Sequence, residues 1–196
     1  MQTLNCESGA ELEVKKSKFI AVICPFADFE RVHSNLKEKH PKAAHIAWAW
    51  RKFGDFNQLA ENSSDDGEPK GSAGAPILDV MRGAELVEAA IFVVRYFGGI
   101  KLGVGGLVRA YGGAANLAIN AAELIKFEFK FDCAFFVPFA LLARFEHYFE
   151  SSNLKASSKE FGAEGCEIRL ALTKDEETAL RDFASAFAGG GFRFLA

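Results

Sequence analysis

The pattern of hydrophobic and polar residues in the first part of the chain predicts a small β-sheet. Two short apolar runs, Leu12–Val14 and Phe19–Cys24, flank a basic turn and predict a pair of strands. In Ala43–Trp50 the bulky residues recur at every second position, so this segment predicts a strand with one bulky buried face. Ala90–Phe97 is a continuous apolar run rich in β-branched residues, which is typical of a central strand buried on both faces.

Three segments of the same part show helical signals, and one long segment shows no periodicity. Asp28 is a candidate N-cap for a helix that continues to about Lys39. Ile77–Arg82 predicts a short helix, and Leu107–Ile125 has apolar residues near the helical period. Lys52–Ala75 has no sustained periodicity and predicts a long loop, which inside a compact domain is usually functional or mobile.

The last third of the chain predicts a second domain, which begins after a boundary near residues 126–133. Its elements follow in the order βαββαβ, which fits a ferredoxin-like domain. The expected strands are 134–137, 155–161, 167–172 and 191–195, and the expected helices are 139–149 and 175–187. The sequence therefore predicts an α+β protein with two domains, residues 1–130 and residues 131–196.

Composition and charge restrict the function. The chain contains 20 Phe and 3 Tyr, and because a phenyl ring has no polar group most of these rings should be buried. Residues 1–130 contain 16 Lys and Arg and 16 Asp and Glu, whereas residues 131–196 contain 7 and 10, so the second domain carries the whole net charge of −3. Non-specific nucleic-acid binders normally have a basic excess. Any nucleic-acid role must therefore rest on a local basic patch.

The cysteines and the longest apolar runs predict a cytoplasmic protein with no membrane partner. The four cysteines are far apart and match no metal-ligand spacing, which favours free thiols in a reducing compartment. The first residues are polar and acidic, unlike a secretory signal. The apolar runs are too short and too interrupted for a transmembrane helix.

The first candidate site is an acidic loop. Its residues are Asp65, Asp66, Gly67, Glu68 and Pro69. Three carboxylates within four residues could hold Mg²⁺ or Ca²⁺ through oxygen ligands. They could equally form a tight turn, in which Asp side chains accept hydrogen bonds from backbone N–H groups. We favour the turn and expect no metal and no cofactor.

The second candidate is a glycine-rich basic loop that runs from the buried strand into a helix. The residues of interest are Arg95, Gly98, Gly99, Lys101, Gly103, Gly105, Gly106 and Arg109. Successive N–H groups in such a loop can form an anion site supported by the helix dipole, and the three cations would surround it. The alternative is that the glycines only allow the strand and the helix to pack closely. The loop matches neither a Walker A motif nor a dinucleotide-binding fingerprint.

His45 and Arg51 form the third candidate, because the alternation in Ala43–Trp50, continued by one residue, places both on the same predicted face. The small residues Ala47 and Ala49 between them leave room for something to approach. A lone histidine on a strand is more often structural than catalytic. No serine or cysteine has an evident base, so covalent catalysis has no support and we expect no catalytic residue.

At these loops the sequence resembles the YigZ/IMPACT family. The motifs that carry the resemblance are Asp65–Pro69, Gly71–Pro76, Arg95–Tyr111, Lys16–Ala21 and Ala44–His45. The resemblance implies a first domain with the fold of ribosomal protein S5 domain 2 and a ferredoxin-like second domain. It also implies a connection with translation, because eukaryotic relatives are regarded as translation regulators that act through protein partners. No agreed enzymatic activity comes with the family.

We therefore expect a non-catalytic regulator associated with translation. The glycine-rich basic loop would bind RNA, the ribosome or a translation-regulating protein. The alternative is an enzyme that acts on a phosphorylated small molecule or nucleotide in the same cleft, with His45 as acid or base. A third candidate is a protein-interaction module that holds its partner on an apolar patch of the second domain's sheet.

Overall fold

The computed structural model describes residues 1–187 and 189–195, which form two compact units, Met1–Phe127 and Glu128–Ala196. Each unit has its own hydrophobic core, and the predicted α+β fold class with two domains is confirmed. The boundary predicted between residues 130 and 131 lies slightly further along the chain than this division. Among the described residues, every helix is too short or too polar to cross a membrane.

The first unit contains a five-stranded antiparallel sheet in the order β2-β3-β6-β4-β5. Its strands are β2 (Ser8–Val14), β3 (Ser17–Pro25), β4 (His45–Phe53), β5 (Leu59–Ser64) and β6 (Ala89–Tyr96). The continuous apolar run forms the central strand β6, which is buried along almost its whole length. A short pair, β1 (Gln2–Thr3) and β7 (Ile125–Lys126), connects the beginning and the end of this unit.

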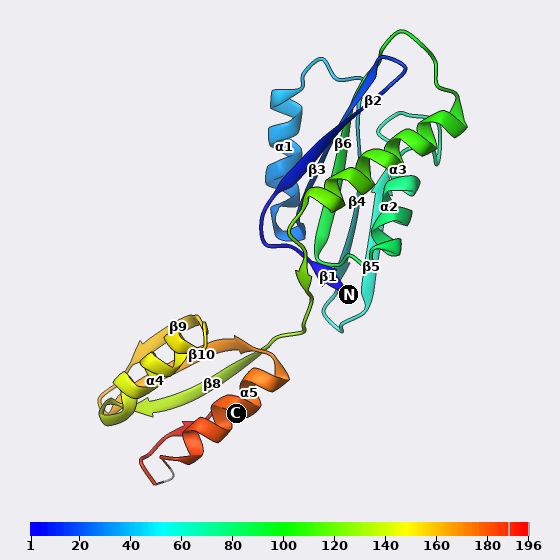
Figure 1. Cartoon of the computed structure of the whole chain (residues 1–196). Helices are drawn as coiled ribbons and strands as arrows, with labels where there is room; N and C mark the ends of the chain where they lie inside the picture. The colour runs from blue at the N-terminus through cyan, green and yellow to red at the C-terminus, as the bar shows by residue number, and fades with distance from the viewer. Residues whose placement is uncertain (188, 196) are drawn as a thin grey trace. The chain divides into compact units, whose positions relative to one another are not determined.

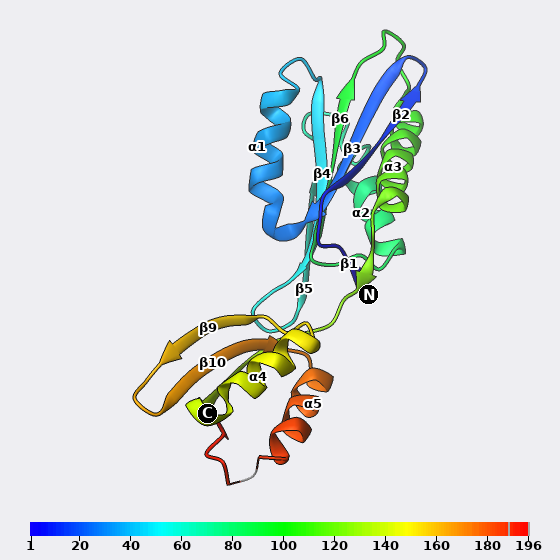
Figure 2. The ribbon, with the colours of Figure 1, turned by 60° about the vertical axis from the view of Figure 1, so that its left-hand side comes forward.

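Helices cover both faces of this sheet, as Figures 1 and 2 show. The helices are α1 (Phe29–Lys39), which follows the 3-10 turn Phe26–Asp28, α2 (Gly74–Gly83) and α3 (Val104–Ala121). Val32 and Leu36 of α1 are buried against one face, and α2 and α3 form the main core on the other. Asp28 lies at the predicted N-cap, but its side chain accepts a hydrogen bond from Arg31 instead of capping the helix.

The small residues of β4 are covered by a helix. Ala47 and Ala49 are fully buried in the same core as Ile77 and Met81 of α2. Because alanine side chains are short, the helix can pack closely on the strand. The space that the sequence suggested for an approaching ligand is therefore filled by α2.

The prediction of one long loop over residues 52–75 was wrong. β4 continues to Phe53, and residues 59–64 form β5, which pairs with β4 at the edge of the sheet. The strand has the sequence Leu-Ala-Glu-Asn-Ser-Ser, and its residues are only partly buried or exposed. An edge strand of this kind needs no alternation of apolar and polar residues, so its sequence carried no strand signal.

The glycine-rich loop begins against the turn between β2 and β3. This turn consists of Lys15 and Lys16, whose φ angles are 47° and 66°. A Cβ atom on Gly98 would lie 2.0 Å from the carbonyl carbon of Lys16, so only glycine fits there. The Gly98 N–H also donates a hydrogen bond to Ser17 Oγ (3.1 Å). These contacts fix the start of the loop to the hairpin.

The second unit has the predicted βαββαβ order. Its elements are β8 (Phe131–Pro138), α4 (Phe139–Ser151), β9 (Ala156–Phe161), β10 (Gly165–Leu172), α5 (Lys174–Ser185) and β11 (Arg193–Phe194). The sheet is antiparallel with the order β11-β8-β10-β9, which is the ferredoxin-like arrangement. Thr173 and Glu176 form a capping box at the start of α5.

The aromatic residues of the second unit form its core and leave the open face of the sheet mainly polar. The buried rings include Phe135, Phe145 and Phe149, which pack with the partly buried rings of Tyr148, Phe183, Phe187, Phe192 and Phe194. On the opposite face Glu167 and Arg169 are exposed, and the guanidinium of Arg193 lies 4.4 Å from the ring centroid of Phe136. The described residues of this face therefore give no support to the third candidate, which needs a contiguous apolar patch.

Candidate functional site

The acidic loop is organised by its own carboxylates. Asp65 accepts hydrogen bonds from the backbone N–H groups of Gly71 (2.7 Å), Ala73 (3.0 Å) and Gly74 (2.8 Å), at the start of α2. Asp66 accepts one from the N–H of Ile46 in β4 (2.6 Å). Burial raises the pKa of Asp65, but the three N–H donors outweigh this effect and hold it below its ordinary value. The carboxylates thus cap backbone groups, and the described residues contain no cluster of three metal-ligating side chains.

Glu68 is the buried centre of the site. Its side chain is 3% exposed, and Oε1 accepts hydrogen bonds from Arg95 Nη1 in β6 (2.6 Å) and from the Tyr111 hydroxyl in α3 (2.8 Å). Burial, and then the hydrogen bond to Glu68, raise the pKa of Tyr111 above its ordinary value, so the phenol stays protonated and donates. This carboxylate connects the acidic loop with the central strand and with α3.

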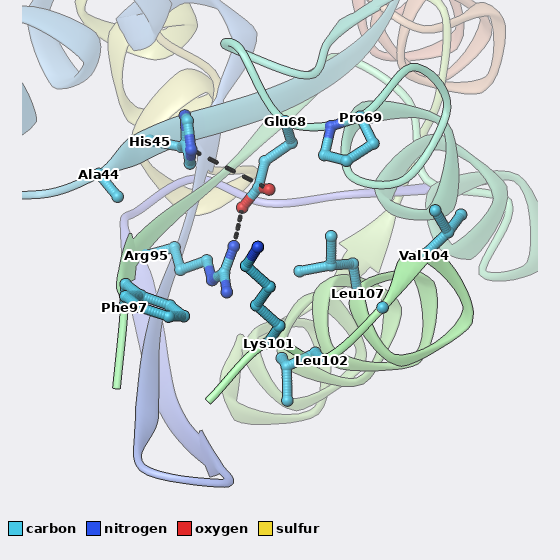
Figure 3. Close-up of a pocket in the computed structure, with 11 residues that line it drawn as sticks. Ala44, His45, Glu68, Pro69, Arg95, Phe97, Lys101, Leu102, Val104 and Leu107 are labelled. Atoms are coloured by element: carbon cyan, nitrogen blue, oxygen red, sulfur yellow. Dashed lines mark hydrogen bonds and ion pairs between the residues drawn. The ribbon is translucent and has the colours of Figure 1, made fainter. Parts of the chain in front are cut away.

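His45 has a defined orientation beside Glu68. Its Nδ1 lies 2.6 Å from the carbonyl oxygen of Asp66, and because a carbonyl only accepts, Nδ1 carries the proton and donates. The other ring nitrogen, Nε2, lies 4.0 Å from Glu68 Oε2. A Cβ on Gly67, whose φ is 85°, would lie 3.4 Å from the imidazole ring. Figure 3 shows the imidazole, Glu68 and Arg95 in sequence along one wall.

A pocket of about 480 Å³ opens between the acidic loop and the glycine-rich loop. It is lined by Ala44, His45, Glu68, Pro69, Arg95, Phe97, Lys101, Leu102, Gly103, Val104 and Leu107. In Figure 3 the side chain of Lys101 extends into the pocket, and the apolar side chains of Leu102, Val104 and Leu107 form the wall opposite His45. The pocket therefore combines a paired charge, a cation and an apolar wall.

The glycines of the loop have different structural roles. Gly99 and Gly103 have φ angles of 86° and 70°, which other residues rarely adopt. Gly103 is the N-cap of α3 and has no side chain to cap it, and Gly105 and Gly106 lie in the first turn of that helix. The N–H donors that the sequence suggested for this loop are thus those of the α3 N-terminus, and Gly103 and Val104 bring that terminus to the pocket.

The structure brings His45, Glu68, Pro69, Arg95, Lys101 and Gly103 together at this pocket. The other predicted residues do not line it, and Arg109 and Arg51 have clearly different surroundings. Arg109 lines a neighbouring pocket of about 170 Å³ with Val14, Lys15, Leu102, Gly106 and Ala110. Arg51 is buried, and its Nη1 donates to the carbonyl oxygens of Met81 in the last turn of α2 (3.3 Å) and of Leu86 after that helix (3.0 Å). Arg51 does not join the pocket, because it lies six residues along β4 from His45 and satisfies carbonyl groups at the other end of the strand.

Sequence reasoning missed Tyr111 and the turn residues Lys15 and Lys16 as members of the site region. Tyr111 fits the apolar period of α3 and is fully buried, so its hydroxyl gave no separate signal. The turn residues could have been found. The sequence pattern already indicated a basic turn between two strands, and the structure places both lysines at positive φ, as a two-residue hairpin turn requires.

Comparisons with known proteins agree with this fold and these motifs. Residues 15–119 match the Impact N-terminal domain, which covers more than half of the chain and includes both loops. A Thermus thermophilus protein described as an IMPACT family member in the pol 5′ region is 38% identical over 160 residues, which cover 81% of this chain and 86% of that protein. This two-domain chain therefore belongs to the IMPACT family.

Two further relatives extend the comparison. An IMPACT family member of Haemophilus influenzae is 43% identical over 130 residues, which cover 63% of each chain and so less than two thirds of that protein. The crystal structure of a hypothetical protein aligns with a TM-score of 0.68 and 30% identity over 100% of this chain and 96% of that one. A solved structure thus aligns with both domains of this chain.

We predict that removing one partner of the buried Glu68–Arg95 pair destabilises the first unit, because the other charge is then buried without a partner. Arg95→Met should lower the free energy of unfolding by about 3–5 kcal/mol, since it leaves a buried carboxylate without its partner. Adding Glu68→Gln, which removes the charge, should restore most of that loss. Urea denaturation measures both. Arg82→Met, which removes an exposed pairing with Glu61, is the matched control and should lower the free energy of unfolding far less than Arg95→Met. A double variant as unstable as Arg95→Met alone would contradict this prediction.

We also predict that Asp65 gives stability that depends on its negative charge. Asp65→Asn should lower the free energy of unfolding at pH 7 by about 1–2 kcal/mol, because it weakens three backbone hydrogen bonds. The pKa of Asp65 is lowered in the fold, so its contribution is complete above its unfolded pKa of about 3.9 and is lost as the pH falls through the lower folded value. Denaturation curves at several pH values should therefore converge in acid. Asp55→Asn, at an exposed position, is the control.

Proposed function

We propose that this protein is a non-catalytic regulator associated with translation, and that it binds RNA of the ribosome through the glycine-rich basic loop. Membership of the IMPACT family supports the connection with translation that the resemblance implies. The geometry supports the binding surface. The protein's neutral first domain supports selective recognition rather than strong binding to any RNA.

The main observation in support of the proposal is the group of cationic side chains around the glycine-rich basic loop. Lys101 lines the first pocket, and Arg109 and Lys15 line the neighbouring one, which shares Leu102 with it. Lys16 is adjacent in the turn that contacts Gly98. Exposed apolar side chains lie in the same region, including Phe97 (52% exposed). Cations that contact phosphates beside a ring that stacks on a base are the usual components of a single-stranded RNA site.

The paired groups at the base of the pocket support a binding role more than a catalytic one. Glu68 is held by Arg95 and Tyr111, and the two aspartates of the loop are held by backbone N–H groups. Each of these groups therefore has a structural partner. An enzyme that transferred a phosphoryl group would need such carboxylates free to hold a metal ion or a proton.

A second candidate is the enzyme that acts on a phosphorylated small molecule in the same pocket. It is favoured by one observation, the fixed orientation of His45, whose Nε2 points to Glu68 within a pocket of small-molecule size. Such an enzyme would convert a nucleotide or phosphorylated metabolite with multiple turnovers, and His45→Ala would abolish that conversion. Product formation under these conditions would replace the proposal of a non-catalytic protein.

The test of the proposal is co-sedimentation with ribosomes over a salt series. The variant Lys101→Ala with Arg109→Ala removes two exposed cations and leaves the buried Arg95–Glu68 pair intact. We expect the native protein to associate in a salt-dependent manner, and we expect the double variant to bind more weakly, with a log–log salt slope smaller by about 2.

The control for this measurement is Lys37→Ala with Lys39→Ala. It changes the net charge by the same amount on α1, which covers the opposite face of the sheet from α3 (Figure 2). The control should associate like the native protein. Equal binding of native protein and double variant, or no association of the native protein at low salt, would contradict the proposal. Association that persists after ribosomal RNA is digested would indicate a protein partner instead.

A further inference from the structure

We propose that the pocket between the two loops binds the terminal phosphate and the base of a single nucleotide, that is, a nucleoside 5′-monophosphate unit. Such a unit is available as a free mononucleotide or as the 5′-phosphorylated end of an RNA strand. This inference rests on the proposed function and deepens it, because it assigns a chain end, and not an internal segment, to the pocket.

The size of the pocket fits one nucleotide. Its volume of about 480 Å³ lies in the lower part of the range for small-molecule sites. Buried side chains form its base: the side chain of Glu68 is 3% exposed and that of Arg95 is 8% exposed. A site of this size with a polar base and an apolar wall suits a compact ligand with one charged end.

The charge of the pocket matches a phosphate monoester. Glu68 and Arg95 compensate each other, so Lys101 is left as the charged side chain that determines the sign. The N-terminus of α3 adds about half a positive charge, which gives about +1.5 together with the lysine. A phosphate monoester carries about −1.5 to −2 at neutral pH, whereas an internal diester carries about −1. A terminal phosphate therefore compensates the pocket better than an internal one.

The N-terminus of α3 also presents N–H donors to the pocket. Gly103 is the N-cap of α3, and among the described residues no side chain caps the first turn of that helix. Arg95 lines the base of the pocket, but its Nε–H, which has no hydrogen-bond partner among the described residues, is covered by protein atoms and does not face a ligand. Helix N-termini bind phosphate groups readily, and a phosphate at Gly103 and Val104 would accept from these N–H groups and from Lys101 Nζ.

The apolar part of the pocket is suited to the base. Phe97 lines the pocket and is 52% exposed, with the guanidinium of Arg95 5.6 Å from its ring centroid. A base that enters the pocket can stack on this ring, and Leu102 and Val104 can contact the sugar. An inorganic phosphate would gain nothing from these side chains.

The neighbouring pocket distinguishes the two sources of the ligand. It contains Arg109 and Lys15 and shares Leu102 with the first pocket, so it can hold the next phosphate of a strand. If the ligand is an RNA end, a 5′-phosphorylated trinucleotide should bind more tightly than the mononucleotide. Arg109→Ala should lower the affinity for the trinucleotide more than the affinity for the mononucleotide. If the ligand is a free mononucleotide, the 5′-phosphorylated trinucleotide and the mononucleotide should bind with equal affinity.

The experiment is isothermal titration calorimetry of the full chain with a nucleoside 5′-monophosphate, the unphosphorylated nucleoside, inorganic phosphate and trinucleotides with and without a 5′-phosphate. We expect the monophosphate to bind more tightly than the nucleoside and than inorganic phosphate. Lys101→Ala should raise the Kd for the monophosphate by about tenfold or more. Lys101→Arg keeps the positive charge and should retain most of the native affinity. Phe97→Ala should raise the Kd for the monophosphate by about tenfold but leave that for inorganic phosphate unchanged. Lys37→Ala is the matched charge control.

Three results would overturn the inference: no binding of the monophosphate at millimolar concentration, equal binding of nucleoside and monophosphate, or an affinity that Lys101→Ala leaves unchanged. The failure is distinguishable from failure of the proposed function. Ribosome co-sedimentation that depends on Lys101 and Arg109, without nucleotide binding, would overturn only the inference that the pocket binds a terminal nucleotide. Nucleotide binding without ribosome association would support the pocket and overturn the role in translation.

Discussion

The hydrogen-bonded group of Glu68, Arg95 and Tyr111 is the interaction on which the rest of the site depends. One buried carboxylate connects the acidic loop, the central strand β6 and the helix α3. Charges are buried only when they are paired, so each partner keeps the others in place. His45 joins the same arrangement through the carbonyl oxygen of Asp66, which adds strand β4. The two loops are therefore held at a fixed separation, and the pocket lies between them.

This pairing also decides what the pocket can bind. Because Arg95 and Glu68 compensate each other, the sign of the pocket depends on Lys101 and on the N-terminus of α3. The other cations of the region lie on the neighbouring pocket and on the β2–β3 turn. A neutral domain thus presents a local cationic surface beside an exposed aromatic ring, and we propose that this combination recognises a phosphate and a base together.

The parts of the fold that depend on apolar periodicity could be predicted, and the parts that depend on polar partners could not. The run that became β6 and the helical period of α3 both identified their elements, whereas the polar edge strand β5 had no periodic signal. Among the site residues, Glu68 and Arg95 could be identified from the sequence, because they belong to the acidic loop and to the glycine-rich basic loop. Their contact could not be predicted, since it joins residues 27 positions apart and includes the hydroxyl of a core tyrosine. The strand pattern placed Arg51 on the same face as His45. It could not show that Arg51 lies at the end of β4 where it donates to carbonyl oxygens of Met81 and Leu86.

The most direct test of the central claim is photo-crosslinking of the native protein on ribosomes, with mass spectrometric mapping of the crosslinked peptides. The proposed surface predicts RNA crosslinks in residues 95–109, with Phe97 and Lys101 among the attachment points, and in the turn that contains Lys15 and Lys16. Crosslinks confined to α1 or to the second unit, with none in residues 95–109, would contradict the account.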